Sequence, residues 1–155
     1  MAKNNVVSIP LCPNTKVTLE CTTENVPSTL YRFIIGSLLY LIASRPDIMY
    51  YVGLVARFQS NPRASHLQTA KRILRYVKGT LSYGLHYLYS PSLPIITYSD
   101  ADCSGSLPDR KSTSGCWYLL GSYMVSWLSK KQSTASSSIT EAEYIAAAQA
   151  GSQLL

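Results

Sequence analysis

The amino-acid sequence predicts an α+β fold, in which a helical segment precedes antiparallel strands and a closing helix. Two observations carry this prediction. Apolar residues recur at helical spacing over residues 28–80, whereas short runs rich in β-branched and aromatic residues follow from residue 81. The period changes near Gly79–Ser82, which is therefore the predicted domain boundary. We expect an extended linker over residues 1–27, a helical unit over 28–80 and a strand-bearing unit over 81–155.

The linker is indicated by three prolines among scattered polar residues, with one short strand expected near Lys16–Leu19. The stretch Met1–Pro10 has no long apolar region, so no targeting signal is predicted. Four widely spaced cysteines lack the paired spacing of a zinc site and favour a reducing intracellular compartment, cytoplasmic or nuclear. The sequence has no Gly-x-Ser-x-Gly elbow and no Gly-rich phosphate loop, which disfavours serine hydrolases and P-loop enzymes.

Three helices are expected in the helical unit. Thr29–Ser44 is apolar on most sides and indicates a buried helix, since its apolar run is shorter than the roughly 20 residues that span a bilayer. The second helix begins at Pro46, a residue favoured in a first turn, and runs to about Gln59. The third, from about Ala64 to Lys78, is amphipathic. Its packing face is predicted to comprise Leu67, Ala70, Leu74 and Val77.

The strands of the second unit are predicted to be Gly84–Tyr89, Ile95–Ser99, Ser114–Leu120 and Tyr123–Ser129, with a final helix from about Ile139. The last two strands flank Gly121-Ser122, a two-residue loop that favours a hairpin. Such a hairpin would place Leu120 opposite Tyr123 and Cys116 opposite Trp127.

Basic residues are unevenly distributed along a chain of formal net charge +6. No acidic residue occurs from Ile48 to Ser99, and a block of one sign attracts phosphate backbones, although a solvated helix face is the plainer alternative. The candidate nucleic-acid-binding residues are Lys71, Arg72, Arg75 and Lys78 on the third helix, and Arg110, Lys111, Lys130 and Lys131 beside the hairpin. The alternative role of the last four is to keep the hairpin end soluble. Trp117 and Trp127 are interpreted as sheet-core residues rather than base-stacking platforms.

Two acidic clusters stand out, because only eight residues of the chain are acidic. Asp100 and Asp102 end a predicted strand, and Glu141 and Glu143 lie in the first turn of the final helix. Carboxylates on a strand end and a helix start can bind a hard cation such as Mg²⁺, and paired ions assist phosphodiester hydrolysis. The structural alternative is that the glutamates close Ser-x-x-Glu and Thr-x-x-Glu capping boxes, and that the aspartates accept hydrogen bonds in a turn.

Several motifs, in one order along nearly the whole chain, resemble the Pol polyprotein of copia-type retrotransposons. The segments Tyr31–Leu41, Arg45–Ile48 and Ala70–Thr80 are similar to the end of its reverse transcriptase. The segments similar to the ribonuclease H portion that follows are Tyr98–Asp102, Asp109–Gly115, Ser126-Trp127, Ser129–Gln132 and Thr140–Ala146. A single short match would be weak, but this many in one order is a specific signal.

The resemblance implies that residues 28–80 are a reverse transcriptase thumb- or connection-like segment and that 81–155 are the N-terminal half of a ribonuclease H-like domain. Domains of this family cleave the RNA strand of RNA–DNA hybrids with two Mg²⁺ ions. By motif, Asp100 resembles the first catalytic carboxylate and Glu141 the second, so both are expected to ligate metal. The implied partners are an RNA–DNA hybrid or other nucleic acid and the rest of the Pol polyprotein, with no membrane.

The chain departs from the family pattern in two ways. Asp102-Cys-Ser-Gly105 stands where the family usually has Asp-Trp-Ala-Gly, which removes an aromatic packing residue. The polymerase acids and the later ribonuclease H acids have no counterpart here, so Mg²⁺ binding is expected to be weak or absent and the chain alone inactive. The alternative hypotheses are a non-catalytic, retrotransposon-derived relic with general nucleic-acid affinity, and a chain whose incomplete sheet does not fold stably.

Overall fold

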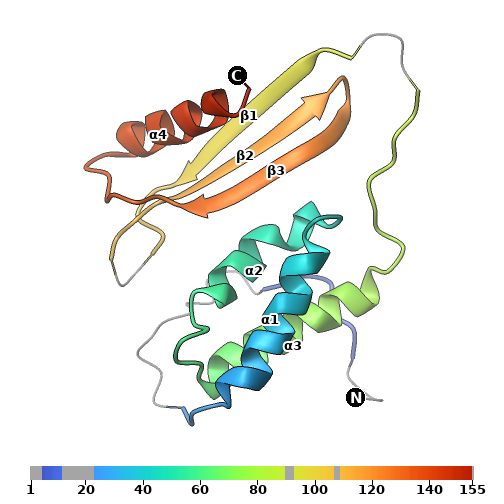
Figure 1. Ribbon diagram of the computed structural model, residues 1–155, viewed down its shortest axis with the longest axis vertical. Helices are drawn as coiled ribbons and strands as arrows, with labels where there is room; N and C mark the ends of the chain where they lie inside the picture. Colours follow the sequence, from blue (N-terminus) through green and yellow to red (C-terminus); the bar gives the residue numbers. More distant parts are fainter. Residues whose placement is uncertain (1–4, 12–22, 90–92, 107–108, 155) are drawn as a thin grey trace. The chain divides into compact units, whose positions relative to one another are not determined.

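The computed structural model describes residues 5–11, 23–89, 93–106 and 109–154. The chain forms two compact units, residues 1–84 and 85–155. Helices make up the first unit, and an antiparallel sheet with one helix makes up the second (Figure 1), which confirms the predicted α+β class. The strand expected at Lys16–Leu19 falls outside the described residues. Within the described ranges, no helix combines the length and apolarity needed to cross a membrane.

The helical unit contains α1 (Ser28–Leu41), the 3₁₀ helix η1 (Pro46–Ile48), α2 (Met49–Ala56) and α3 (Ala64–Gly79). These elements match the three predicted helices, the second of which opens with the 3₁₀ turn at Pro46. Proline suits this position because its fixed φ fits a first turn and its missing N–H would have no helical partner. The end of the predicted linker is tied to the start of α3, since the N–H of Ala64 donates to the carbonyl of Glu24 at 2.9 Å.

The core of the helical unit lies between its α-helices. Its fully buried residues are Tyr31, Ile35, Leu38, Ile48, Val52, Val55, Ala70 and Ile73. The packing face of α3 is rotated relative to the prediction: Ile73 and Tyr76 are buried, whereas Leu67, Leu74 and Val77 are only partly buried. Both α1 and α2 contact α3, so its buried stripe is centred between the two contacts.

A buried polar cluster joins η1 to the end of α3. Arg45 is only 6% exposed, and its Nη2 lies 2.7 Å from Asp47 Oδ2. The hydroxyl of Tyr76 donates to the same carboxylate oxygen at 2.9 Å, and the remaining donors of Arg45 reach Thr80. Residues of two reverse transcriptase-like motifs therefore have a structural role in this unit.

The second unit contains β1 (Ile95–Asp102), β2 (Thr113–Leu120), β3 (Tyr123–Lys131) and α4 (Ile139–Ser152). The three strands form one antiparallel sheet in the order β1-β2-β3. Helix α4 packs on one face of the sheet, over β1 and β2 (Figure 1). Its buried residues are the alanines at 142, 146 and 150, whose small side chains allow a close approach to Cys116 and Tyr118 of β2.

The strand predicted over Gly84–Tyr89 is wrong. This segment has no regular structure and pairs with no described strand. A run of β-forming residues becomes a strand only when a neighbouring strand supplies backbone hydrogen bonds and one of its faces is packed. Most side chains of this segment are exposed, so it has no such packed face. The segment is held instead by Tyr87, whose hydroxyl donates to the carbonyl of Met124 at 2.7 Å.

The β2–β3 hairpin contains a bulge that the sequence did not predict. Leu120 pairs with Tyr123, as predicted, but Cys116 pairs with Leu128 instead of Trp127. The register shifts after the second pair from the turn, where β3 has one residue more than β2. A shift of one residue exchanges the two faces of a strand, so the bulge places Leu128 on the α4 side and Trp127 on the other.

Candidate functional site

Asp100 lies near the end of β1, on the face of the sheet that α4 does not cover. It pairs with Gly115, one position from the pair of Ser99 and Cys116. Cys116 faces α4, because its thiol donates to the carbonyl of Ala146 at 3.8 Å, and successive residues of a strand face opposite sides. The side chain of Asp100 is therefore exposed on the open face, beside a glycine that adds no side chain.

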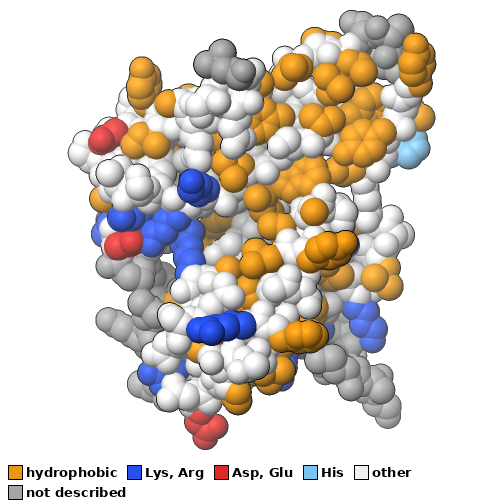
Figure 2. Space-filling view, in the orientation of Figure 1, with side chains coloured by type: hydrophobic (Ala, Val, Ile, Leu, Met, Phe, Trp, Pro, Cys, Tyr) orange, Lys and Arg blue, Asp and Glu red, His pale blue; other side chains and the backbone are white. Residues whose placement is uncertain are grey.

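The open face also carries aromatic side chains. Tyr98 and Trp117 are register partners whose rings stack with centroids 5.9 Å apart and planes inclined at 27°. Trp117 is 36% exposed, so its interpretation as a sheet-core residue is wrong. Strand alternation places it opposite the α4-covered core. Figure 2 shows hydrophobic side chains gathered over the strands of this unit.

Glu141 lies in the first turn of α4 and closes the helix start. Ser138 is the N-cap, and its hydroxyl oxygen accepts from the N–H of Glu141 at 3.1 Å. The carboxylate in turn accepts two hydrogen bonds of 2.6 Å from Ser137, one from the hydroxyl and one from the backbone N–H. These bonds, chiefly that from the hydroxyl, hold the pKa of Glu141 below its usual range. Ser138 therefore caps α4, but the Ser-x-x-Glu capping box is only half formed, because the Glu141 carboxylate bonds the N–H of Ser137 and not that of Ser138. The Thr-x-x-Glu box is wrong because α4 already begins at Ile139.

Gln132 connects the sheet to the first turn of α4. It follows β3 directly and is buried, with 6% of its surface exposed. Its Nε2 donates to Ser114 Oγ at 3.0 Å and to the carbonyl of Ala142 at 2.9 Å, and its Oε1 accepts from the hydroxyl of Ser136 at 3.0 Å. The place of Gln132 in a family-like motif is the one feature of the sequence that pointed to it.

The carboxylate of Asp102 lies against Gly105 in the turn after β1. A Cβ atom at position 105 would lie 1.8 Å from Asp102 Oδ2, so a larger residue there would displace this exposed carboxylate. Between them, Ser104 has a φ of 55°, and its N–H donates to Ser112 Oγ at 3.1 Å. The turn in which the chain departs from the family pattern thus retains the glycine of that pattern.

The four basic residues beside the hairpin differ in their surroundings. Lys131 pairs with Asp109, Nζ to Oδ2, at 2.6 Å, and the hydrogen bond from Lys131 lowers the pKa of Asp109 to about 2. Lys111 donates from Nζ to a backbone carbonyl of the loop after β3. Arg110 and Lys130 are exposed. Two of the four candidate nucleic-acid-binding residues are therefore engaged in loop structure.

The basic residues of α3 also fall into two pairs. Lys71 and Lys78 are exposed, whereas Arg72 and Arg75 are half-buried. The Nε atoms of the two arginines are buried and have no hydrogen-bond partner in the part of the chain that the structure describes. Long basic side chains commonly pack their stems on a surface while the charged end reaches water. The two lysines are thus more accessible than the two arginines of this helix.

The donor set fits Mg²⁺ in kind but not in number. Carboxylate oxygens are the ligands that Mg²⁺ prefers. Asp100 supplies them on the open face of the sheet, whereas Glu141 supplies them from α4, which covers the other face, so the structure does not bring the two carboxylates to one side of the sheet. Among the described residues, no three side chains of His, Cys, Asp and Glu gather closely enough to hold a metal ion. Two carboxylates, one of them also bonded to Ser137, are an incomplete ligand set.

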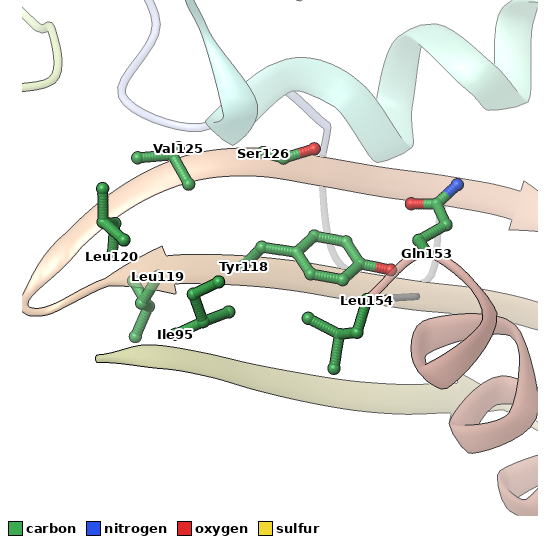
Figure 3. A pocket seen from close by; sticks show the side chains of 8 residues that line it. All are labelled: Ile95, Tyr118, Leu119, Leu120, Val125, Ser126, Gln153 and Leu154. Atoms are coloured by element: carbon green, nitrogen blue, oxygen red, sulfur yellow. The ribbon is translucent and has the colours of Figure 1, made fainter. Parts of the chain in front are cut away.

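An apolar pocket of about 240 Å³ lies at the other end of the sheet. Figure 3 shows the ring of Tyr118 lying along it, between Ile95 and the last residues of α4. The remaining lining residues are Leu119, Leu120, Val125, Ser126, Gln153 and Leu154. With no acidic or basic side chain in its wall and Ile95 at the opposite end of β1 from Asp100, this pocket adds nothing to the carboxylate site.

Comparisons with known proteins identify the family to which these elements belong. The chain is 42% identical over 148 residues to the retrovirus-related Pol polyprotein from transposon RE1 of Arabidopsis thaliana, covering 96% of this chain. It is 38% identical over 157 residues to the retrovirus-related Pol polyprotein from transposon TNT 1-94 of Nicotiana tabacum. It is also 41% identical over 128 residues to secreted RxLR effector protein 161 of Plasmopara viticola, covering 82% of this chain and 88% of that protein.

The α+β chain with its ordered motifs is a retrotransposon-type Pol segment. It belongs to the copia-type retrotransposon Pol polyprotein family, which confirms the resemblance drawn from the motifs. The chain spans 10% of the length of the RE1 polyprotein and 12% of that of TNT 1-94. No family model and no solved structure matches it.

Proposed function

We propose that the second unit is part of a Mg²⁺-dependent ribonuclease H that cleaves RNA in RNA–DNA hybrids, and that Asp100 and Glu141 are metal ligands within it. The observation that carries the proposal is that both motif carboxylates belong to one compact unit, Asp100 near the end of β1 and Glu141 in the first turn of α4. The family-like order of the motifs supports it.

The chemistry assigned to the two residues follows from their positions. Asp100 offers its oxygens on an open, solvent-facing sheet surface, where a nucleic-acid backbone has access. Glu141 offers its carboxylate at the N-terminal end of α4, where Ser137 fixes its orientation. Mg²⁺, when bound, would supply positive charge to the entering and leaving oxygens of the phosphodiester. Because the two carboxylates are an incomplete set, we expect this chain alone to bind Mg²⁺ weakly and to be inactive.

A cleavage assay tests the expected inactivity. The purified chain is incubated with a labelled RNA–DNA hybrid and Mg²⁺, beside Asp100→Ala as a matched control. We expect no cleavage above the level of the variant. Robust cutting by the chain that disappears in Asp100→Ala would overturn the expected inactivity while supporting the role of Asp100.

Metal ligation is tested separately with Mn²⁺, whose unpaired electrons broaden nearby NMR signals. Mn²⁺ added to the ¹⁵N-labelled chain should broaden the amide signals of Asp100 and Glu141 together. Asp100→Asn should remove the joint effect. Asp109→Asn is the control, because the Asp109 carboxylate is paired with Lys131 and should have a smaller influence. Broadening at neither site, even at millimolar Mn²⁺, would contradict the proposed ligand roles.

The second candidate is a non-catalytic relic with general nucleic-acid affinity. It is favoured by the stretch from Ile48 to Ser99, which has basic residues and no acidic one. Fluorescence anisotropy with a labelled hybrid should then show that the logarithm of the binding constant falls linearly with the logarithm of salt concentration. Lys71→Gln with Lys78→Gln should reduce that slope, whereas Lys111→Gln should change it less, because its Nζ is engaged in the loop. Salt-insensitive binding would count against this candidate.

A further inference from the structure

We infer that the open face of the sheet around Gly115 binds an arginine side chain of a polypeptide partner. In this site the guanidinium group stacks on the rings of Tyr98 and Trp117 and pairs with the carboxylate of Asp100. The inference goes beyond the proposed function and does not rest on it, because a guanidinium group needs neither a metal ion nor Glu141. Its evidence is the bare glycine, the aromatic rings beside it and the unpaired carboxylate on the neighbouring strand.

Gly115 is a glycine in the middle of a regular strand. Its register pairs are Asp100 on one side and Ser129 on the other, and the bulge of the hairpin lies further along β2. An added Cβ atom would meet nothing closer than the backbone oxygen of Asp100, at 4.0 Å, and the φ of Gly115 is not positive. Neither internal packing nor backbone geometry therefore requires a glycine. Glycine weakens a strand, and away from a bulge it often marks a place where a ligand approaches closely.

A row of aromatic side chains borders this bare position. Tyr98, Trp117 and Trp127 are register partners across the three strands, and all three lie on the face that α4 does not cover. The rings of Tyr98 and Trp117 stack with centroids 5.9 Å apart, yet 50% and 36% of these residues remain exposed. Trp117 is two residues from Gly115 and is thus its neighbour on the open face. The faces of such rings attract cations, and a planar guanidinium group stacks on them.

Asp100 supplies the complementary charge. Its carboxylate is exposed and has no hydrogen-bond or ion-pair partner in the part of the chain that the structure describes. Strand alternation places Lys131 on the same face, but its ammonium group is already paired with Asp109. Without a bound metal ion, this face favours a cationic group over the phosphates of a nucleic acid. Arginine fits better than lysine, because its planar fork can stack on a ring while it bonds a carboxylate.

NMR titration of the ¹⁵N-labelled chain tests the site, because both tryptophans of the chain lie on this face and their indole N–H signals report binding. The probe is the peptide acetyl-Ala-Arg-Ala-amide, added in the presence of a metal chelator. The control peptide has citrulline, which keeps the shape of arginine without its charge. We expect saturable shifts of the indole signals and of the Gly115 amide with the arginine peptide, and about fivefold weaker binding of the citrulline peptide.

Three variants separate binding from stability. Gly115→Val fills the bare position with a better strand former, so it should weaken binding by about tenfold while it keeps or raises the thermal stability. Asp100→Asn keeps the shape and removes the charge, and should weaken binding by about fivefold. Glu141→Gln is the matched control, since Glu141 belongs to α4 on the other side of the sheet, and should leave the affinity within about twofold.

Several outcomes would overturn the inference. These are the absence of saturable shifts, equal binding of the two peptides, unchanged affinity in Asp100→Asn or Gly115→Val, and an equal loss in Glu141→Gln. Tighter binding of a single-stranded oligonucleotide at the same indole signals would do so as well, since the face would then be a base-stacking surface. Should Gly115→Val fail to fold, Gly115→Ala must still weaken binding. Failure of the proposed metal site leaves these results unaffected, because the chelator removes metal from every titration.

Discussion

The guanidinium group of Arg45 donates to both oxygens of Thr80, from Nη1 to the carbonyl at 3.0 Å and from Nη2 to the hydroxyl at 2.7 Å. Thr80 is the residue that ends α3. Arg45 also bonds the carboxylate of Asp47, from Nε at 2.9 Å and from Nη2 at 2.7 Å. One side chain thus satisfies a buried helix end and a carboxylate at the same time.

Replacing Arg45 should destabilise the helical unit. Arg45→Met is expected to lower the free energy of unfolding by about 3 kcal/mol, because Asp47 and Thr80 lose a buried, charged partner. Urea unfolding followed by far-ultraviolet circular dichroism measures the change. Lys71→Met, on the exposed surface of α3, is the control and should cost less than about 0.5 kcal/mol. Similar decreases in the free energy of unfolding in both variants would show that the hydrogen bonds of Arg45 do not stabilise the unit.

The same cluster predicts a loss of stability in acid. The hydrogen bond from Arg45 holds the pKa of Asp47 below its usual value, although burial acts in the opposite direction. A carboxyl with a lowered folded pKa stabilises the fold above its unfolded pKa of about 3.9, and this contribution is lost as the pH falls through the folded pKa. Asp47→Asn should therefore be less stable than the unmodified chain near neutral pH, with a difference that shrinks in acid. A pH-independent difference in urea unfolding would refute this.

The register of the hairpin should survive the deletion of Val125. Met124 pairs with Leu119 and Ser126 with Tyr118, so Val125 is the additional residue of the bulge. Its deletion would remove the bulge and leave the other register pairs of β2 and β3 as they are, so Leu128 should stay opposite Cys116 and the ion pair of Lys131 should still form. We expect hydrogen-exchange protection in β3 to be retained.

The control for this deletion is Val125→Ala, which keeps the residue count. The Val125 side chain is 47% exposed, so the substitution should cost less than about 1 kcal/mol and leave amide protection in place. Loss of protection in β3 after the deletion, with normal protection in Val125→Ala, would contradict this expectation.

Gly105 and Asp102 should be energetically coupled. Gly105→Ala is expected to destabilise the second unit by less than about 1 kcal/mol, because the added methyl group would displace the exposed Asp102 carboxylate. In the background of Asp102→Ala, the same substitution should cost less, since the overlapping atoms are gone. Thermal unfolding of the four proteins forms a double-mutant cycle. Additive costs would show that the two side chains do not compete for space.

The sequence predicted the helices and the long strands because each has a repeating apolar pattern that local packing enforces. The prediction failed where a segment's structure depends on pairing with another segment of the chain. Gly84–Tyr89 has the composition of a strand but no ladder partner among the described residues. The bulge shifted the pairing of Cys116, since a two-residue turn fixes register only until the next irregularity.

The candidate site was predictable in its residue types but not in its surroundings. Motif order singled out Asp100 and Glu141, and a Ser-x-x-Glu pattern correctly indicated a helix cap. Nothing in the sequence revealed that Ser137 supplies both bonds to the Glu141 carboxylate, or that Lys131 is paired with Asp109. These are contacts between segments, and they depend on how loops fold back on the sheet.

The outer side of β1 has a consequence for handling this protein in solution. Because the carbonyl of Pro94 accepts from the N–H of Gly121 on the β2 side, the backbone groups of Ile95, Thr97, Ser99 and Ala101 point the other way. Within the described residues no strand occupies that side, so it is a template on which another polypeptide backbone can add. Asp100 and Asp102 are the only charged residues of β1. Their carboxylates repel those of a second copy of the strand and so oppose pairing at this edge. Neutralising Asp100 to probe catalysis therefore also makes the chain more prone to aggregate.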